Sequence, residues 1–472
     1  KEIKVKKIIL HAPAIVVISD GSGGFNFSTI GKTDRAGREA ETKDKAERPD
    51  KQREPGAFEI ALLDISDGDL HYIDRKSSTD LRVGQVDLKV EDFELNQPFA
   101  VKLAAALYAD KQNLQFAGKF GALRPGLDFN QVPVDGKIDI DPIDLSRLKA
   151  AAPKLRDALP KDLDLGGMFR VNALKFKGTL KDLELDGGID GTQGMIRYGN
   201  SFHKPAGMAL TLSSEARYSG DRISIRRGRL KLHSLEVATA GDIQLGEATA
   251  LNLSIDSKPA SLEGWDKIFP AIASYQLAGT MEVKAQLRGK AGKGAAPDVQ
   301  GVLSLTKASA KPPKFPKPIE NLDTKIKFTG QRADIGDMTL TLGSSRIRLA
   351  AAIEKFAPLT LTYKLSTPEL RPADYSESLS DERKADVLRN LVSEGQLNMA
   401  GTTTTYQGRL SSAEGKLYNV AYKGLESSLT LANQVASIKN LRVNAMSGAV
   451  QLDGEYSFKE AAPRFTVATR VQ

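Results

Sequence analysis

The sequence predicts a mostly β protein built from antiparallel meanders, with a few short helical crossings between groups of strands. Three observations predict this fold class. Apolar and polar residues alternate along most of the chain, turn residues recur at roughly every 10 to 15 positions, and helical patterns are few and regularly spaced. Alternation with a period of two is typical of strands with one apolar and one solvated face. Closely spaced turns favour antiparallel pairing of neighbouring strands.

The strands follow in chain order. The alternation is clearest in segments 58–62, 86–90, 208–212, 222–226, 230–232, 281–287, 324–328, 338–342, 347–349 and 359–363. Glycine, aspartate and serine gather between such segments, and this composition predicts hairpin turns at 66–68, 186–188, 219–221 and 446–448.

Three helical crossings are expected, each opening near a proline that follows a strand pattern. Asp141 is a candidate N-cap with Pro142 at the first helical position, and a second helical segment covers residues 258–269. The third segment opens at 367–370 and continues into a helix from about 381 to 394, with Leu388, Leu391 and Val392 on one stripe and Gly395 as its stop.

The spacing of these prolines indicates an internal repeat. Pro142, Pro259 and Pro368 lie 259 − 142 = 117 and 368 − 259 = 109 residues apart. The repeat predicts four β units, at 1–157, 158–272, 273–394 (ending in the helix) and 395–472, the last one incomplete. Residues 31–56 lack any apolar side chain larger than alanine and are expected to form a charged surface insertion.

Composition excludes several classes of protein. The chain has 472 residues, a formal net charge of +8 and no cysteine, which excludes disulfide scaffolds, thiolate zinc sites, iron–sulfur clusters and cysteine nucleophiles. No apolar run is long enough to span a membrane as a helix. Positive charge is spread along the chain and aromatic residues are sparse, so nucleic acid is not an expected partner. The chain begins at Lys1 and ends in a strand pattern, and we expect it to be part of a longer protein.

Enzymatic motifs are incomplete. Asn26 stands where the first glycine of a phosphate-binding loop belongs, and segment 21–26 lacks the third glycine of the dinucleotide fingerprint, so a glycine-rich hairpin is expected there. The four histidines are far apart and no pair has zinc-ligand spacing. We therefore expect no enzyme activity, catalytic residue, metal or cofactor. A polysaccharide enzyme with two carboxylates meeting in a cleft stays open as a minor alternative.

The strand patterns leave a long apolar face that something must cover. A second sheet, a closed solenoid or an apolar ligand in an open trough would each do so, and an acyl chain suits a trough because its burial is worth about 0.8 kcal/mol per methylene. The candidate groove residues are the apolar members of the alternating segments: Met208, Leu210, Leu212, Ile223, Ile225, Met281, Val283, Ile326, Phe328, Met338, Leu340, Leu342, Ile347, Leu349, Leu359 and Leu361.

Segment 5–27 (VKKIILHAPAIVVISDGSGGFNF) consists of a strand, a proline, an apolar strand and an Asp–Gly–Asn-type hairpin ending in aromatic residues. In this order of elements, the first 120 residues resemble the start of the AsmA family. Segments 58–74 and 113–118 are similar to the family's next elements, and the later repeat looks like the β-groove architecture of AsmA-like and TamB-like proteins.

The resemblance implies an elongated, twisted β-trough (a repeating β-groove) and a location in the bacterial periplasm. It implies an inner-membrane anchor helix upstream of Lys1, and a non-enzymatic bridge that carries phospholipids toward the outer membrane. Outer-membrane or envelope proteins would be further partners. The alternative is a self-packed β scaffold that organises partners in outer-membrane assembly.

Overall fold

The computed structural model describes residues 3–19, 26, 58–94, 96–123, 128–157, 159–246, 249–291, 297–313, 315–356, 358–401, 403–457 and 464–471. The expected fold class is confirmed, because strands make up 72% of the structure and helices only 6%. The charged insertion expected at 31–56 and nearly all of the glycine-rich hairpin lie outside the described residues.

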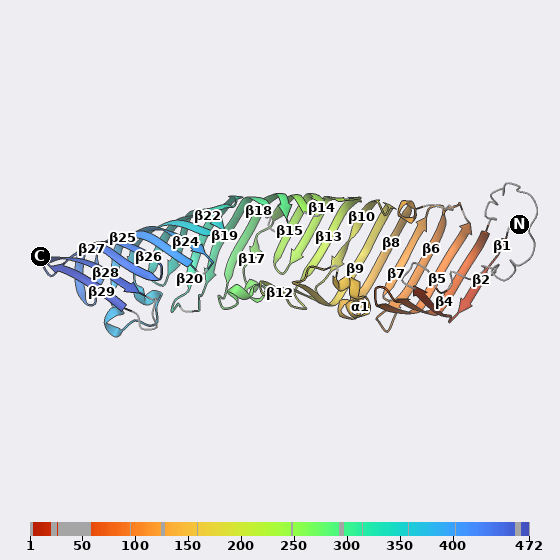
Figure 1. The fold of residues 1–472 in the computed structure, drawn as a ribbon, viewed down its shortest axis with the longest axis horizontal. Coiled ribbons are helices and arrows are strands. Elements are labelled where there is room, and N and C mark those ends of the chain that lie inside the picture. The colour runs from red at the N-terminus through yellow and green to blue at the C-terminus, as the bar shows by residue number, and fades with distance from the viewer. Residues whose placement is uncertain are drawn as a thin grey trace, which may run out of the picture. The chain divides into compact units, whose positions relative to one another are not determined.

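The chain forms two compact units, residues 1–229 and 230–472, whose boundary falls inside β14 (Arg222–Leu232) and within the second expected repeat. In each unit, strands that follow one another in the sequence lie side by side (Figure 1). The elements of the first unit are β1 (Ile3–Val5), β2 (Ile8–His11), β3 (Ala14–Ser19), β4 (Phe58–Asp74), β5 (Thr79–Glu94), β6 (Phe99–Leu107), β7 (Leu114–Phe120), the 3-10 helix η1 (Phe129–Gln131), β8 (Val134–Asp144), α1 (Leu145–Ala151), α2 (Pro153–Asp157), β9 (Leu163–Thr179), β10 (Asp182–Asp190), β11 (Gly194–Tyr198), β12 (Phe202–Lys204) and β13 (Leu210–Ser219).

The sheet of the first unit is antiparallel from β4 to β10 and β13, and the short strands β1, β2 and β3 join β4 in parallel. A small second sheet forms where the start of β9 pairs with β11 and β11 pairs with β12. Buried Lys204 holds it in place, because its ammonium group donates to the carbonyl oxygens of Gly191 at 2.7 Å, Thr192 at 2.9 Å and Gly194 at 2.6 Å.

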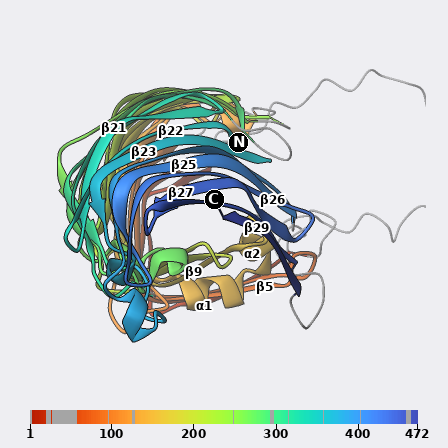
Figure 2. The same cartoon turned by 90° about the vertical axis from the view of Figure 1, so that its left-hand side faces the viewer.

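The second unit is an antiparallel meander in which each long strand from β18 to β28 pairs with the next, after β15 pairs with β16 and β16 with β18. Strands such as β21, β23 and β25 follow curved paths (Figure 2). The elements are β15 (Leu235–Gln244), β16 (Thr249–Ser257), β17 (Ala260–Ser261), η2 (Trp265–Lys267), η3 (Pro270–Ile272), β18 (Ala278–Ala291), β19 (Asp298–Ala310), β20 (Ile319–Gly330), β21 (Arg332–Leu342), β22 (Ser345–Phe356), β23 (Leu359–Leu370), η4 (Pro372–Asp374), η5 (Asp381–Arg383), β24 (Val387–Ala400), β25 (Thr403–Leu417), β26 (Val420–Ala432), β27 (Val435–Ala445), β28 (Gly448–Ser457) and β29 (Arg464–Val471).

A recurring bulge interrupts the ladders of both units. Asp67, Ala173, Lys307 and Asn440 have left-handed backbone conformations inside strands, and the register shifts beside each of them. At each bulge, an aspartate of a neighbouring strand accepts the backbone N–H of the left-handed residue. The pairs are Asp67 with Asp87 (2.9 Å), Ala173 with Asp139 (2.7 Å), Lys307 with Asp323 (2.9 Å) and Asn440 with Asp453 (2.6 Å). The carboxylate replaces the ladder hydrogen bond that the bulge removes, so the strand bends without leaving a donor unpaired.

The three crossings lie where the sequence places them, but they are shorter and less helical than expected. Pro142 belongs to β8, and the N-cap of α1 is Asp144, whose carboxylate accepts the backbone N–H of Ser146 at 2.8 Å. The prediction of Asp141 as the cap was wrong, because Asp141 still continues the strand and its N–H donates to the carbonyl of Asn113. The second crossing contains only 3-10 turns, and 367–370 is the end of β23.

The helix expected at 381–394 was also wrong, since only 381–383 form a 3-10 turn and β24 begins at Val387. Asn390 has φ 49° inside β24. A left-handed residue reverses the alternation of side chains, so Leu388 and Leu391 face the same side although three positions separate them. This spacing imitates a helical stripe, whereas Val392 points the other way and is 37% exposed.

Two of the four expected hairpin turns are confirmed. Residues 219–221 join β13 to β14, and 446–447 join β27 to β28. The other two were wrong: 66–68 lies inside β4 at the Asp67 bulge, and 186–188 lies inside β10 where the register with β9 shifts. At 66–68 the left-handed residue is Asp67 itself, whereas at 186–188 it is Ala173 on the neighbouring strand β9, so glycine and aspartate can mark a bulge or its partner as well as a turn.

The bulge carboxylates make stability depend on pH. The N–H of Asp67, and then the side chain of Gln112, hold the pKa of Asp87 below its ordinary value. This stabilisation is complete above the ordinary aspartate pKa and is lost as the pH falls through the lower folded value. We expect Asp87→Asn to lower the free energy of unfolding at pH 7 by less than about 1 kcal/mol, since the carboxylate is exposed.

Urea unfolding of Asp87→Asn and the parent at pH 7 and pH 3 measures this effect. The difference between the two proteins should shrink at pH 3. Asp110→Asn, in the loop between β6 and β7, is the control and should show no such change. A difference that stays constant or grows at pH 3 would contradict the assignment.

Candidate functional site

One face of each sheet is apolar along the strand pairings. In the second unit, cross-strand partners form two uninterrupted rows. Row 1 consists of Thr239, Ile255, Ala285, Gly301, Phe328, Ala333, Ile353, Leu361, Leu397, Tyr406, Leu431, Ala436 and Tyr456. Row 2 consists of Val283, Leu303, Ile326, Ile335, Ala351, Tyr363, Gly395, Gly408, Leu429, Ile438 and Gly454.

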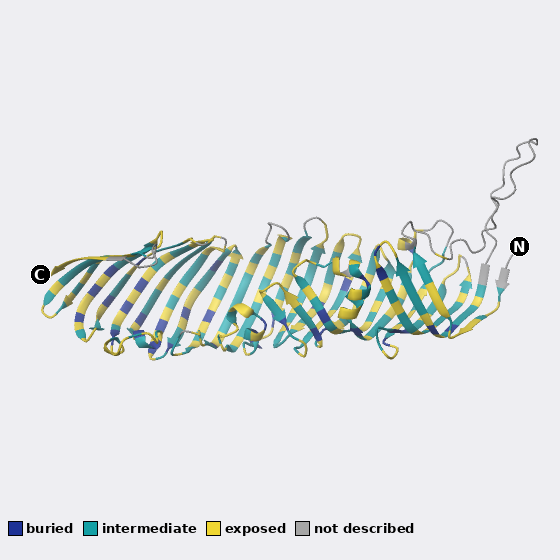
Figure 3. Cartoon of the chain, turned by 60° about the horizontal axis from the view of Figure 1, so that its bottom comes forward, coloured by how far each residue is buried: buried dark blue, intermediate teal, exposed yellow. Residues whose placement is uncertain are grey.

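The first unit has the same arrangement. Its main row consists of Ile65, Leu88, Leu103, Phe116, Ile138 and Leu174, and a second row of Leu114, Ile140, Val171, Ile189 and Leu212 lies beside it. Most of these side chains are half-buried, and Ile189 and Leu212 are more than 40% exposed. Buried and exposed positions alternate along the strands (Figure 3). Within the described residues of the second unit, all strands belong to one continuous sheet, and no second sheet lies over its rows.

The opposite face is polar. One row across it in the second unit consists of Lys327, Asp334, Ala352, Thr362, Gln396, Gln407, Thr430, Ser437 and Glu455. A row across it in the first unit contains Lys89, Lys102, Lys137 and Lys175. Apolar side chains on one face and polar ones on the other are typical of an antiparallel sheet with one solvated face.

Aromatic pairs show that the apolar face is concave. Phe116 of β7 and Phe176 of β9 lie on either side of β8, yet their ring centroids are 6.0 Å apart. Tyr363 of β23 and Tyr406 of β25 lie on either side of β24, with centroids 6.4 Å apart. Two strand spacings amount to about 9.6 Å. Both pairs therefore converge over the strand between them, as side chains do on the inner side of a curved sheet.

Glycine makes room for these rings. Gly136 of β8 faces the first pair, and a Cβ atom there would lie 3.1 Å from each ring. Under the second pair, a Cβ on Gly395 would lie 3.0 Å from the ring of Tyr406, and one on Gly408 would lie 2.2 Å from its Oη. The rings therefore lie flat across the floor of the sheet instead of projecting from it.

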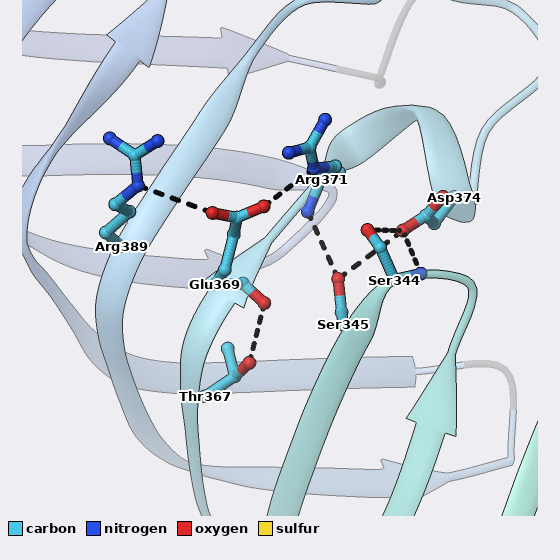
Figure 4. A network of polar contacts seen from close by, with 7 residues as sticks. All are labelled: Ser344, Ser345, Thr367, Glu369, Arg371, Asp374 and Arg389. Atoms are coloured by element: carbon cyan, nitrogen blue, oxygen red, sulfur yellow. Dashed lines mark hydrogen bonds and ion pairs between the residues drawn. The ribbon is translucent and has the colours of Figure 1, made fainter.

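Most buried apolar side chains of the second unit lie outside the two rows, in which Ala333 is the most buried residue, at 1% exposed. The most buried apolar side chains outside the rows include Ile268, Leu391 and Leu425, with Met338, Leu342 and Ile347 on neighbouring strands. The crossing after β23 is tied to its neighbours by two buried carboxylates. Asp374 accepts from the backbone N–H of Ser344 at 3.0 Å (Figure 4), and Asp386 accepts from the N–H of Tyr418 at 2.7 Å.

Charged side chains extend this contact onto the polar face. Glu369 accepts from Arg371 at 2.7 Å and from Arg389 at 3.3 Å, as Figure 4 shows. Hydrogen bonding to Arg371 is the main cause that holds the pKa of Glu369 below its ordinary value. These exposed pairs add little stability individually, but they fix the side chains at the end of β23.

The sixteen candidate groove residues fall into four groups. Val283, Ile326, Phe328, Leu361 and Leu212 lie in the rows described above; Met281, Leu340, Leu349, Leu359 and Leu210 alternate with them on the same face and are half-buried. Met338, Leu342 and Ile347 share this face but are buried in the core. Met208 lies in a bend before β13, and Ile223 and Ile225 are half-buried in β14.

Sequence analysis did not single out a polar cluster within the apolar face. The hydroxyl cluster consists of Tyr363, Ser393 and Tyr406, in which Tyr363 Oη lies 3.0 Å from Ser393 Oγ and 2.7 Å from Tyr406 Oη. Burial, together with the hydrogen bond to Tyr363, raises the pKa of Tyr406 to about 12. Ser393 was missed because it fell in the expected helix. Tyr363 was recognised only as part of an alternating strand.

Three of the four histidines pair with different partners at separate places in the described structure. His11 pairs with Ser66 at 2.7 Å, His71 with Asp80 at 2.7 Å, and His233 with the carbonyl of Glu263 at 2.6 Å. Among the described residues, no group of three histidine, aspartate or glutamate side chains is placed to hold a metal ion. No helix in the described part of the chain is long and apolar enough to cross a membrane.

The glycines beneath the aromatic pairs are expected to be necessary for the stability of the folded sheet. We expect Gly408→Ala to lower the free energy of unfolding by about 1–3 kcal/mol, because the new methyl group would collide with Tyr406 and the sheet backbone. Gly336→Ala in β21 is the control, since its nearest neighbour would be 4.0 Å from the added Cβ. Urea unfolding measures both variants, and equal effects would contradict the argument.

Thr324, on the same apolar face, is a position where a substitution is expected to stabilise the protein. Its buried hydroxyl has no hydrogen-bond partner in the described structure. Thr324→Val keeps the shape and removes the unpaired group, so we expect it to raise the free energy of unfolding by about 1 kcal/mol. Thr329→Val, exposed on the same strand, should change stability by less. A loss of stability in Thr324→Val would mean that the hydroxyl is satisfied in solution.

In comparisons with known proteins, no family model, no curated protein and no solved structure matches the chain.

Proposed function

We propose that this chain is a non-enzymatic lipid transfer protein that binds phospholipid acyl chains on its apolar concave face and conducts them between the inner and outer membranes. The observation that carries the proposal is the pair of uninterrupted apolar rows, half-buried on a concave face with no second sheet over them among the described residues. An apolar face of this extent needs a partner in water, and acyl chains provide one.

The arrangement suits passive movement of a chain-like ligand. Neighbouring positions in the rows are chemically similar, so a methylene chain has nearly the same contacts at each step along a row, from one strand to the next. Each methylene that leaves water gains about 0.8 kcal/mol. The charged opposite face keeps the protein itself in water.

Location and partners belong to the same proposal. A periplasmic protein anchored to the inner membrane by a helix outside this sequence, acting with outer-membrane or envelope proteins, would place such a face between two membranes. The resemblance of residues 1–120 to the AsmA family supports this location.

A self-packed scaffold of the cell envelope is the second candidate. One observation favours it: Met338, Leu342 and Ile347 are buried by the protein itself. A scaffold would use its apolar face for packing and would carry no lipid.

A pair of neighbouring substitutions separates the two functions. We expect Phe328→Asp, on the apolar face, to reduce lipid binding at least tenfold while the fold survives, because a carboxylate in the path of an acyl chain loses its hydration. Thr329→Asp, exposed on the opposite face of the same strand, should bind lipid as the parent does.

Native mass spectrometry with lipid extraction, and crosslinking with a photoreactive acyl phospholipid, measure binding. Thermal unfolding checks the fold of each variant. A folded parent that carries no lipid and does not crosslink would favour the scaffold. Equal binding by a folded Phe328→Asp variant would remove β20 from the path.

A further inference from the structure

The hydroxyl cluster is a polar group enclosed by apolar neighbours. Tyr363 and Ser393 are flanked in their strands by Leu361, Leu365 and Leu391, and Tyr406 is paired with Leu397 and Leu431. Leucine or phenylalanine could pack at the two tyrosine positions, as apolar side chains do elsewhere in the rows. The three hydroxyls therefore add a chemical property that packing alone does not need.

The cluster lies on the floor of the concave face. Because Gly395 and Gly408 have no side chains, the ring of Tyr406 lies against the sheet, with its Oη over Gly408. Tyr363 and Tyr406 are half-buried, and Ser393 is 8% exposed, so the cluster keeps partial contact with the concave side through its two tyrosines.

The cluster has hydrogen-bonding capacity to spare. Each hydroxyl can donate one proton and accept at two lone pairs. The two contacts within the cluster occupy only two of the six lone pairs. A hydroxyl group of a ligand is the best complement, since it can both donate to the cluster and accept from it.

The position of the cluster tells which part of a ligand reaches it. Tyr363 is four residues from the start of β23 at Leu359, and Ser393 is seven residues from the end of β24 at Ala400. At about 3.3 Å per residue, Tyr363 lies about 13 Å from that end of its strand. A headgroup that stays in water at the strand ends cannot touch the cluster, so the polar group must belong to the chain.

We infer that the hydroxyl cluster binds the hydroxyl group of a hydroxylated acyl chain, which makes such chains a preferred cargo of the concave face. This inference rests on the proposed function and adds the chemical class of the chain. A wholly apolar face would reject a hydroxylated chain by about tenfold or more, because its hydroxyl would lose water without gaining a partner. The cluster cancels that penalty.

Competition between two fatty acids tests the inference. The purified chain is loaded with the fluorescent probe cis-parinaric acid, which 12-hydroxystearate and stearate then displace separately. We expect the parent to bind 12-hydroxystearate at least as tightly as stearate. The double variant Tyr363→Phe/Tyr406→Phe should prefer stearate by about tenfold, and Ser393→Ala should give an intermediate ratio.

Controls separate this result from unfolding and from failure of the proposed function. Tyr418→Phe removes a tyrosine hydroxyl outside the cluster, on a residue that is 59% exposed, and should keep the parent's ratio. Thermal unfolding verifies that each variant is folded. A parent that prefers stearate as strongly as the double variant does would overturn the inference but leave lipid binding intact. Failure of both fatty acids to displace the probe, in a parent that also carries no phospholipid, would overturn the proposed function as well.

Discussion

The second unit depends on one constraint: its strands present an apolar face that lacks a second layer of sheet within the described residues. Most two-layer proteins solve this by stacking a sheet or helices over the apolar side. Here the helical content of the crossings is limited to short 3-10 turns, which are too few to form a second layer. The sheet instead curves toward its apolar side, which reduces but does not abolish the exposure of that face.

Curvature is produced by two local devices that the units share. Left-handed bulges bend strands, and an aspartate from the neighbouring strand accepts the amide that the bulge leaves unpaired. Glycines on the floor allow aromatic side chains from the strands on either side to converge. The first device depends on the short aspartate side chain that reaches the bulge amide, and the second depends on glycine, because a Cβ there would collide with the rings.

A concave apolar face with a few fixed polar groups has the general character of a ligand site, in which apolar contacts supply affinity and polar groups supply selectivity. In the proposed function, the leucine, isoleucine and phenylalanine side chains of the rows would make similar apolar contacts with any methylene chain. Tyr363, Ser393 and Tyr406 are different, because their hydroxyls make one place on the floor chemically distinct from its neighbours. If a chain moves along the face, this is where its substituents would matter.

The sequence by itself determined the fold class, since alternation such as that of 281–287 and 359–363 has no other stable outcome than a half-buried strand. It also located the crossings near Pro142, Pro259 and Pro368, and it identified which residues of most strands share a face. These properties are local, because they depend on side-chain periodicity and on the backbone limits that proline imposes.

Only the tertiary structure decided what depends on pairing between strands. The left-handed Asn390 places Leu388 and Leu391 on one side, so the sequence pattern of β24 resembles that of a helix. Only its pairing with β23 and β25 identifies it as a strand. Burial of Met338, Leu342 and Ile347 reflects where the crossing packs, not their own pattern. The hydroxyl cluster joins residues from three strands, the outermost 43 positions apart. Such contacts arise from register and curvature, which no single segment of the sequence specifies.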